Sequence, residues 1–423
     1  MPSQQNEQTS KDFVLAAKEC EIATLVQLAD TCEMVTGISG LIHHLQRERA
    51  LSNIHLVSSG QHLSDHRQQQ IDICRASEQH LRALFCSRYL ESRPDHASMQ
   101  LLNTIALVMQ GMENLESLRS RVTRMTISAE ESTIAFRRLI AGLLSVVFDA
   151  ADVASNPVIT RTLVALFSFM QSKEYAGQER AWGSIGFANG KFSKEWGERI
   201  EQLQEMQESG FQDFVRFCGA DLEALWQSHC ASACEADLNR LRSMITRLCQ
   251  GESIDSEISE VWYKVATARI DALGDLEKAL TRQLLEQCQQ QLATARHELD
   301  HQQARLSDPA IHQTPMTLLF DTKALPFTDN FISRTTVSPD AACSVYELML
   351  GQAEQIKQMS RALAEARRTL DERKTVERAK GLLMQQLGLS EEQAYSKMRE
   401  RAMARNMRLA ELARALIEAA HKS

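Results

Sequence analysis

Two short stretches of this sequence place arginines in largely apolar surroundings. Residues 46–56 read QRERALSNIHL and residues 177–187 read GQERAWGSIGF, so a Glu-Arg-Ala core surrounds both Arg49 and Arg180. A third arginine, Arg269, lies in TARIDAL. Arginine is always charged, and its planar fork of N–H donors matches a small planar oxyanion. Because burying an anion between helices requires compensating cations, we consider these three arginines together as a candidate anion site.

An interhelical salt bridge is the structural alternative for each of these arginines. Glu48 and Glu179 directly precede two of them, so carboxylates are available nearby. His43 and His44 come just before the first stretch and could bind an anion or a metal, although a helical histidine is more often packed or exposed. The residues alone leave ion pairing and ligand binding open for the arginines.

Catalytic motifs are scarce in the sequence. HELDH, from His297 to His301, matches the H-E-x-x-H pattern in which a helix presents two histidines to zinc beside a general base. Its polar flanks indicate an exposed helix, and no third ligand follows at a suitable spacing. The HCASAC stretch, with His229, Cys230 and Cys234, also lacks further ligands. P-loop, dinucleotide-binding and serine-hydrolase motifs are missing. We therefore expect no enzyme, no metal and no cofactor, with a zinc peptidase as the weaker alternative.

The elements that must position the arginines are helical. Hydrophobic residues make up 43% of the 423 residues, aromatic residues only 5%, and there are seven prolines. The prominence of Ala, Leu, Gln, Glu and Arg favours helix. Between residues 15 and 305, apolar positions recur three or four apart, as at Leu139, Leu143, Val146 and Val147. We predict an all-α protein with a large N-terminal helical bundle over 15–305.

A change in composition separates this bundle from the C-terminal part. Four prolines fall within 306–340, which predicts a linker, because proline interrupts helical hydrogen bonding. Residues 341–423 are expected to form a coiled-coil stalk followed by a compact three-helix module. Gly388 is placed to end one helix, and SEEQ from Ser390 is a capping box that opens the next. The heptad-like series that predicts a coiled-coil dimerisation helix, and hence a homodimer, is Met349, Ile356, Met359, Leu363, Ala366 and Leu370.

Charge is unevenly distributed along the chain. Residues 361–423 carry 14 Lys and Arg against 9 Asp and Glu, whereas the remainder carries 33 against 46. A basic module on an acidic body favours nucleic acid as a partner of the module, and a solvated helical face is the alternative. The apolar run LIAGLLSVVF ends at Asp149, too short to span a membrane, and the polar N-terminus does not resemble a signal peptide. We expect a cytoplasmic protein with no membrane partner.

The C-terminal stretch ERKTVERAKGLLMQQLGLSEEQAYSKMRERAMARNMRLAELARALIEA resembles an ANTAR domain. The matching positions are Arg378, Ala379-Lys380-Gly381, Leu382-Leu383-Met384, Ala394-Tyr395, Met398-Arg399 and Ala402-Met403. The resemblance implies a three-helix RNA-binding domain that acts in transcription antitermination. Tyr395 is expected to stack on a loop base, with packing inside the module as the alternative. The cationic residues expected to contact RNA are Arg373, Lys374, Arg378, Lys380 and Arg399.

Three N-terminal segments resemble a NIT domain, the helical module that senses nitrate and nitrite. They are HHLQRERALSNIHLVSSG, with Ala50 where glycine is usual, KEYAGQERAWGSIGFANGKF and VWYKVATARIDALGDLEKAL. The resemblance favours nitrate or nitrite as the ligand of Arg49, with Arg180 and Arg269 as companions. It implies a nitrate- and nitrite-responsive antiterminator, in which ligand frees the C-terminal module to bind leader mRNA hairpins. A terminator then fails to form and the transcribing RNA polymerase reads through. A sensor whose module docks a protein partner is the alternative.

Overall fold

The computed structural model describes residues 10–61, 64–91, 98–151, 156–188, 192–249, 258–306, 364 and 368–421. Within these ranges the regular structure is helical and no strand occurs, which confirms the predicted all-α fold. None of the helices in them is long and apolar enough to cross a membrane. The predicted linker after residue 306, and the heptad-like series before Leu370, lie outside the described residues.

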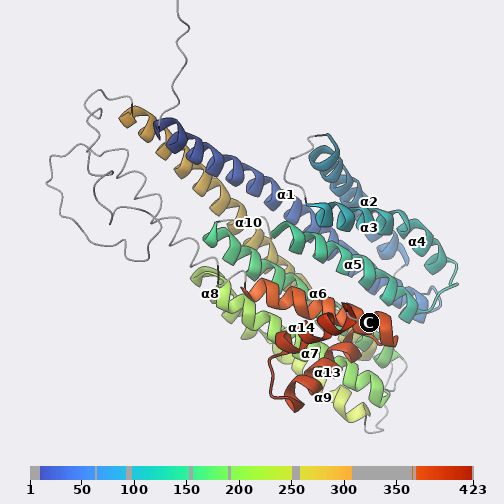
Figure 1. Cartoon of the computed structure of the whole chain (residues 1–423). Coiled ribbons are helices and arrows are strands. Elements are labelled where there is room, and N and C mark those ends of the chain that lie inside the picture. The colour runs from blue at the N-terminus through green and yellow to red at the C-terminus, as the bar shows by residue number, and fades with distance from the viewer. Residues whose placement is uncertain are drawn as a thin grey trace, which may run out of the picture.

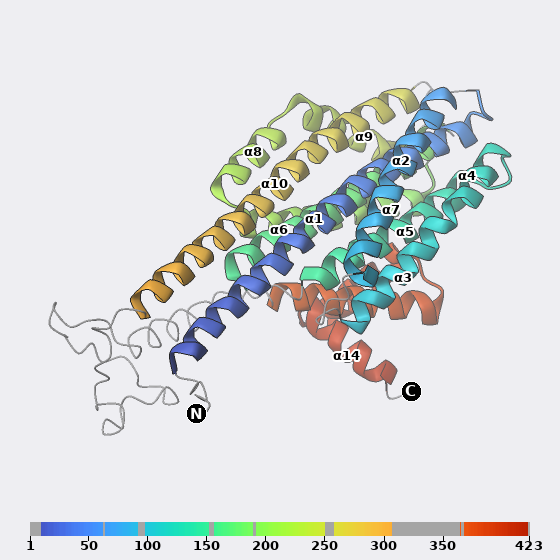
Figure 2. The same cartoon turned by 90° about the horizontal axis from the view of Figure 1, so that it is seen from above.

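The N-terminal part, residues 10–306, is called the body. Its helices are α1 (Ser10–Val57), α2 (Ser64–Phe85) with the π-helical extension η1 (Cys86–Glu91), α3 (Met99–Glu113), α4 (Leu115–Thr123), α5 (Ala129–Ala151), α6 (Pro157–Ala188), α7 (Lys194–Phe217), α8 (Ala220–Cys230), α9 (Ala233–Cys249) and α10 (Ile258–Leu306). The long helices α1 and α10 lie side by side along the body, with α2 to α5 on one flank, α7 to α9 on the other, and α6 between the two flanks (Figures 1 and 2).

The amphipathic pattern predicted from the sequence is buried as expected. On α5, Leu139, Leu143, Val146 and Val147 all belong to one large core cluster shared with α1, α3, α6, α7 and α10. A second cluster surrounds the C-terminal half of α6 and includes Trp262 of α10, which is fully buried. The two clusters meet along α6, so this helix connects the two flanks of the body.

Helix α6 lies at the centre of the body and is buried on nearly all sides. It packs against α1, α5, α7 and α10. A helix enclosed in this way must satisfy its polar side chains inside the protein, because they have little access to water. Its segment from Gln171 to Arg180 is rich in such side chains, and it positions the site described below.

The C-terminal part, residues 368–421, is called the module. It consists of a helix over 368–387, α13 (Glu391–Ala404) and α14 (Leu409–His421). The three helices share a small apolar core that includes Leu383, Met398 and Leu412. Gly388 ends the first helix with a φ of +64°, and Ser390 caps α13 in a complete capping box, as the sequence predicts.

The module lies against the body beside α6 and α7 (Figures 1 and 2). Leu370 of its first helix is buried in the large core of the body. Tyr395 of α13 packs against the second core cluster, around α6, α7 and α9. The two parts therefore form a continuous structure, and the surface between them contains most of the residues of functional interest.

Candidate functional site

Arg49 of α1 is completely buried and forms a two-pronged ion pair with Glu174 of α6. Its Nη1 and Nη2 donate to Oε1 and Oε2 of Glu174 at 2.6 and 3.2 Å. Two side-chain amides, from Gln46 and Gln178, donate to the same carboxylate at 2.9 and 3.0 Å. The Glu174 carboxylate thus accepts four hydrogen bonds while it is almost completely buried.

Gly177 allows the guanidinium of Arg49 to lie against the backbone of α6. A Cβ atom at this position would be 2.6 Å from Nη2 of Arg49, well inside van der Waals contact. Only glycine fits here without displacing the arginine. The Gly in KEYAGQERA therefore belongs to the local packing that places Arg49 opposite Glu174.

Arg180 is buried close to Arg49, but its partners are neutral. Its Nη2 donates to the backbone carbonyl of Gln46 at 2.8 Å, and its Nη1 donates to Oγ1 of Thr267 at 3.1 Å. Among the described residues, no carboxylate lies within ion-pairing distance of this guanidinium. Burial, with a further contribution from the charge of Arg49, lowers the pKa of Arg180 to about 10.

Arg49 and Arg180 meet at Gln46, which contacts both of their networks. Two buried positive charges therefore share one ion-paired carboxylate, that of Glu174. The Nε atoms of both arginines and the Oε1 atoms of Gln46 and Gln178 are buried without a hydrogen-bond partner. Such orphaned groups are costly in a protein interior, and the two Nε donors mark a place where an anion would be stabilised, whereas the two amide oxygens would need a donor. These five residues are called the arginine-pair site.

Arg269 belongs to a different group of side chains. It is paired with Glu235 of α9 and donates to Oε1 of Gln207 at 2.8 Å. Nearby, Glu179 accepts from Nε and Nη2 of Arg242, both at 2.7 Å, and this pairing outweighs burial and lowers the pKa of Glu179. The structure therefore does not bring Arg269 to the arginine pair. It gives Arg269 the interhelical salt bridge that was the alternative explanation.

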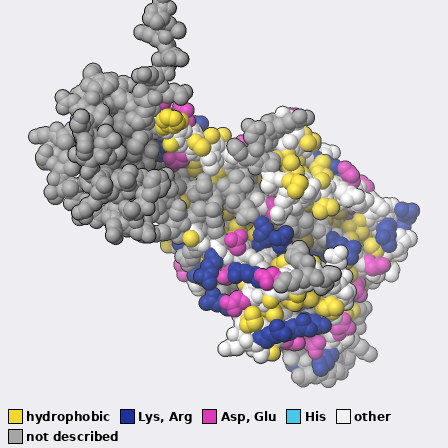
Figure 3. Space-filling view, viewed as in Figure 1, with side chains coloured by type: hydrophobic (Ala, Val, Ile, Leu, Met, Phe, Trp, Pro, Cys, Tyr) yellow, Lys and Arg dark blue, Asp and Glu magenta, His cyan; other side chains and the backbone are white. Residues whose placement is uncertain are grey.

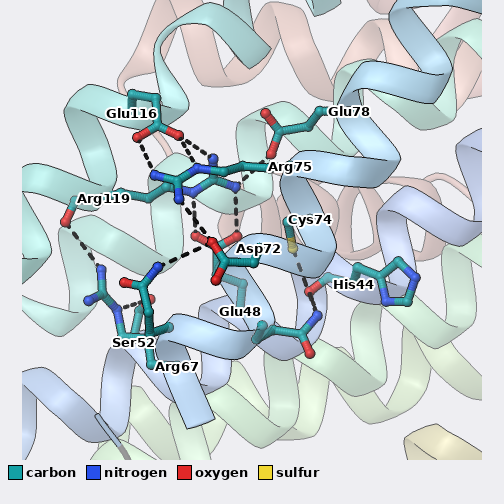
Figure 4. A network of polar contacts seen from close by, with 12 residues as sticks. His44, Glu48, Ser52, Arg67, Asp72, Cys74, Arg75, Glu78, Glu116 and Arg119 are labelled. Atoms are coloured by element: carbon teal, nitrogen blue, oxygen red, sulfur yellow. Dashed lines mark hydrogen bonds and ion pairs between the residues drawn. The ribbon is translucent and has the colours of Figure 1, made fainter. Parts of the chain in front are cut away.

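Glu48 is also engaged elsewhere, so it is not the partner of the arginine that follows it. Arg119 of α4 donates to both oxygens of Glu48 at 2.9 Å and to Glu78 of α2 at 2.6 Å. Glu116 bridges Arg119 and Arg75 (Figure 4). This network ties α1, α2 and α4 together, and it fixes the part of α1 that carries the arginine-pair site.

The zinc-like motifs are not arranged as metal sites. His297 and His301 are exposed on α10, and Glu298 between them is paired with Lys18 of α1. In the HCASAC stretch, Nε2 of His229 is 3.0 Å from a carboxylate oxygen of Glu235 rather than facing the cysteines. In the part of the chain that the structure describes, no group of three or more His, Cys, Asp and Glu side chains could hold a metal ion.

Arg373 joins the first helix of the module to the body. Its Nε donates to Oδ2 of Asp213 on α7 at 2.9 Å, and its Nη2 contacts the same oxygen. Its Nη1 donates to Oε1 of Gln171 on α6 at 2.9 Å, and the amide of Gln171 donates in turn to Glu377 at 3.0 Å. A residue predicted to contact RNA is thus fully occupied by contacts to the body.

Lys380 is buried where the module meets α6. Its Nζ lies 2.8 Å from Glu377 and from Glu391, and 3.5 Å from the hydroxyl of Tyr175. Burial disfavours the charged ammonium, but the two carboxylates outweigh it and raise the pKa of Lys380 well above its ordinary value. Burial also raises the pKa of Tyr175. Lys380 is therefore charged and shielded from solvent in this arrangement.

The other residues predicted to contact RNA are distributed between the interface and the surface. Arg399 is half exposed and paired with Glu205 of α7. Tyr395 is partly buried against the body, and Nζ of Lys374 lies 5.1 Å from the centre of a phenylalanine ring of α5. Arg378 is exposed. Five of the six predicted residues, all but Arg378, thus have a side-chain contact with the body.

Part of the basic surface of the module stays open to solvent. Figure 3 shows Lys and Arg side chains on the face formed by α13 and α14. The exposed arginines of these helices and their connection, besides Arg399, are Arg401, Arg405, Arg408 and Arg414. They lie on the same module as the residues that contact the body.

Several residues of the site were not identified from the sequence. Glu174 stands in the same KEYAGQERA segment as Arg180. Because arginine is always charged, a carboxylate in that segment could have been considered as an ion-pair partner. Asp213 and Arg137 carried no such signal. Arg137 of α5 donates to Glu392 of α13 at 3.0 Å, across more than 250 positions of the chain. Contacts of this range depend on the tertiary fold.

Comparisons with known proteins identify two families and two similar proteins. The family described as nitrate and nitrite sensing (NIT) matches residues 40–285, and the ANTAR domain family matches residues 364–417. The chain is 33% identical over 410 residues to the nitrate regulatory protein of Klebsiella oxytoca, covering 96% of this chain and 94% of that protein. It is also similar to the solved structure of the NasR transcription antiterminator, with a TM-score of 0.61, 28% identity, and coverage of 97% of this chain and 99% of that one.

Proposed function

Because the chain belongs to the family of regulators that join a nitrate- and nitrite-sensing NIT domain to an ANTAR domain, we propose that an anion bound in the body controls RNA binding by the module. The chain is a nitrate-responsive regulator of transcription antitermination. The family is regulatory and not enzymatic, so the HELDH stretch has no part in a peptidase. The proposal concerns how the two parts of the chain communicate.

The ligand, nitrate or nitrite, binds at the arginine-pair site. The observation that carries this assignment is the buried charge of Arg180, which has no carboxylate partner among the described residues. A small planar anion fits the fork of an arginine and would compensate this charge. It would also accept hydrogen bonds from the Nε atoms that have no partner. No metal or cofactor is needed for this recognition.

The docked module represents the form that does not bind RNA. Arg373 is held by Asp213 and Gln171 of the body, and Lys380 is covered by Tyr175 of the body, so neither faces solvent where it could meet phosphates or bases. Ligand shifts the equilibrium toward a free module, and it does so only by the difference in its affinity for the two arrangements. Helix α6 provides the connection, because Glu174 of the site lies next to Tyr175 and one turn from Gln171, which both contact the module.

The freed module binds leader mRNA hairpins in the cytoplasm, and the transcribing RNA polymerase then reads through the terminator. The basic charge of the module and its exposed arginines support RNA as the partner rather than a protein. The heptad-like series before Leu370 supports a homodimer. A module that ignored RNA but retained a protein from solution would favour the alternative, a protein-docking sensor.

The experiment is an RNA-binding titration with and without nitrate. A fluorescent leader-type RNA hairpin is titrated with the full chain in sodium nitrate or in sodium chloride of equal ionic strength. We expect tighter RNA binding in nitrate, and equal affinities in the two salts would refute the proposal.

Two variants of α6 test whether the response to nitrate depends on the arginine-pair site. Arg180→Gln removes a charge without leaving a carboxylate unpaired, so it should fold and lose the response to nitrate. Arg161→Gln removes the same charge from an exposed position of the same helix and should keep the response. If Arg180→Gln responds to nitrate as the wild-type chain does, the anion binds elsewhere.

A further inference from the structure

Glu174 occupies the place that an anion would take at Arg49. A carboxylate and a nitrate ion are both planar and present two oxygens to an arginine fork. In the structure, both oxygens of Glu174 face the Nη atoms of Arg49, and the amides of Gln46 and Gln178 complete its shell. The fork of Arg49 is therefore already filled by an anion that belongs to the protein.

Glu174 also faces the junction between the body and the module. A cavity of about 270 Å³ lies at this junction, and Glu174 and Gln178 form part of its wall, whereas Arg49 does not line it. An anion that enters from the cavity meets Glu174 before Arg49. The charged residues of the cavity wall, besides Glu174, are Arg137, Asp149, Lys374, Glu377, Arg378 and Glu391.

We propose that Glu174 is a tethered competitor of the ligand and the residue that reports its binding to the module. This inference rests on the proposed function. Nitrate or nitrite displaces the carboxylate of Glu174 from Arg49, and the displaced side chain turns into the cavity. There it lies with Glu377 and Glu391, which belong to the module and hold Lys380. The other charged residues of the wall balance at three cations and three carboxylates, so the added carboxylate unbalances them and disturbs the ion pairs that hold Lys380, which loosens the contact between module and body.

Competition with a tethered carboxylate also sets the selectivity of the site. Glu174 is held next to Arg49 at a high effective concentration, since it is part of the adjacent helix. An anion binds only if it gains more from the fork than the carboxylate does. A spherical ion such as chloride has no pair of oxygens to meet two parallel N–H donors, so it competes less well than nitrate with the internal carboxylate.

A purely structural ion pair makes the opposite prediction. If Glu174 only held Arg49 in place, its loss would disorder the fork, and nitrate would bind less tightly. If Glu174 competes with nitrate, its loss should tighten nitrate binding and weaken the response of the module. The two explanations thus differ in the sign of one effect.

The test compares nitrate binding by calorimetry and nitrate-dependent RNA binding for the full chain and its Glu174→Gln variant. Hydrogen bonds to a charged group contribute about 1.5–3 kcal/mol, so we expect the Kd for nitrate to fall by about tenfold or more. We also expect the gain in RNA affinity on adding nitrate to shrink. Glu33→Gln is the matched control, because it removes a carboxylate from another arginine, Arg88, at an exposed position outside both the site and the Arg119 network, and should leave both values unchanged.

The outcomes separate this inference from the proposed function. If the wild-type chain shows no binding of nitrate, the proposed function itself is wrong. If the wild-type chain binds nitrate but Glu174→Gln binds it equally or more weakly, only the competitor role is overturned. If Glu174→Gln binds nitrate more tightly but keeps the full gain in RNA affinity, Glu174 does not report to the module. If thermal melting shows Glu174→Gln to be unfolded, Glu174→Asp, whose shorter side chain competes less well, must still lower the Kd.

Discussion

Replacing Asp213 by asparagine tests the docked arrangement most directly. Asp213 belongs to the body, whereas its partner Arg373 is itself predicted to contact RNA. A change at Arg373 would alter docking and RNA binding together. The substitution Asp213→Asn keeps the shape of the side chain and removes only the charge that holds the arginine, so its effect on RNA affinity reports on docking.

The size of the effect follows from the contact. Two donors of Arg373 meet one oxygen of Asp213, and the side chains are 16% and 30% exposed. Hydrogen bonds to charged groups contribute about 1.5–3 kcal/mol when buried, and exposed ion pairs about 1 kcal/mol or less. For this half-buried pair we take about 1.4 kcal/mol, which is a tenfold change in the docking equilibrium. A module that is about 99% docked would become about 9% free, and its apparent RNA affinity would rise about ninefold.

The assay is fluorescence anisotropy with a leader-type RNA hairpin, in nitrate-free buffer of fixed ionic strength. Asp221→Asn is the matched control, since it removes the same charge from an exposed position of α8. We expect Asp213→Asn to bind RNA several-fold more tightly than both the wild-type chain and the control. Equal RNA affinities of Asp213→Asn and Asp221→Asn would show that the pair with Arg373 does not restrain the module.

Three further predictions concern the interior of the body. Arg49→Ala leaves Glu174 buried without its cation, so we expect a loss of about 3–5 kcal/mol in the free energy of unfolding. Calorimetry should also show no heat of nitrate binding. A melting temperature equal to that of the wild-type chain would contradict the first expectation. Gly177→Ala places a methyl group 2.6 Å from Nη2 of Arg49, so we expect the free energy of unfolding, measured in urea, to fall by about 1–3 kcal/mol. Nitrate should also bind more weakly. Unchanged values of both would exclude a tight fit at this position. Burial, and then the charge of Lys173, lower the pKa of His43 from 6.5 to about 3 although Asp271 lies 3.9 Å away. Below pH 6.5 the folded chain then binds fewer protons than the unfolded chain. The contribution of His43 to the free energy of unfolding is therefore intact above pH 6.5 and falls as the pH drops toward 3. The loss is about 2 kcal/mol at pH 5. Urea unfolding at pH 7.5 and pH 5 should show a smaller drop in the free energy of unfolding for His43→Gln than for the wild-type chain. Identical drops in the two proteins would rule out this role of His43.

Local features of the fold could be predicted from the sequence because they depend on neighbouring residues. The spacing of Leu139, Leu143, Val146 and Val147 follows the helical period, and all four are buried. Gly388 ends a helix because glycine readily adopts a positive φ, and Ser390 begins the next because its side chain caps the helix. Arg49 and Arg180 were found as a pair because both repeat a Glu-Arg-Ala core in apolar surroundings.

The partners of these arginines could not be predicted in the same way. Glu48 is next to Arg49 in the sequence, but successive residues of a helix point about 100° apart, so the two side chains meet different neighbours. The actual partner, Glu174, comes from another helix. Arg269 also has apolar neighbours in the sequence, yet the fold places it opposite Glu235. Pairings between distant helices depend on packing that a single sequence does not display.

The ion pairs between the module and the body have a consequence for how the protein responds to salt. The exposed pair of Arg399 with Glu205 is screened as the ionic strength rises, and the more buried pairs of Arg373 with Asp213 and Arg137 with Glu392 are screened less, which together loosens the docked module. The same screening weakens the grip of a released module on phosphates. The two effects oppose each other, so RNA affinity of the full chain without nitrate should pass through a maximum at intermediate salt, whereas a chain that is already undocked should only lose affinity.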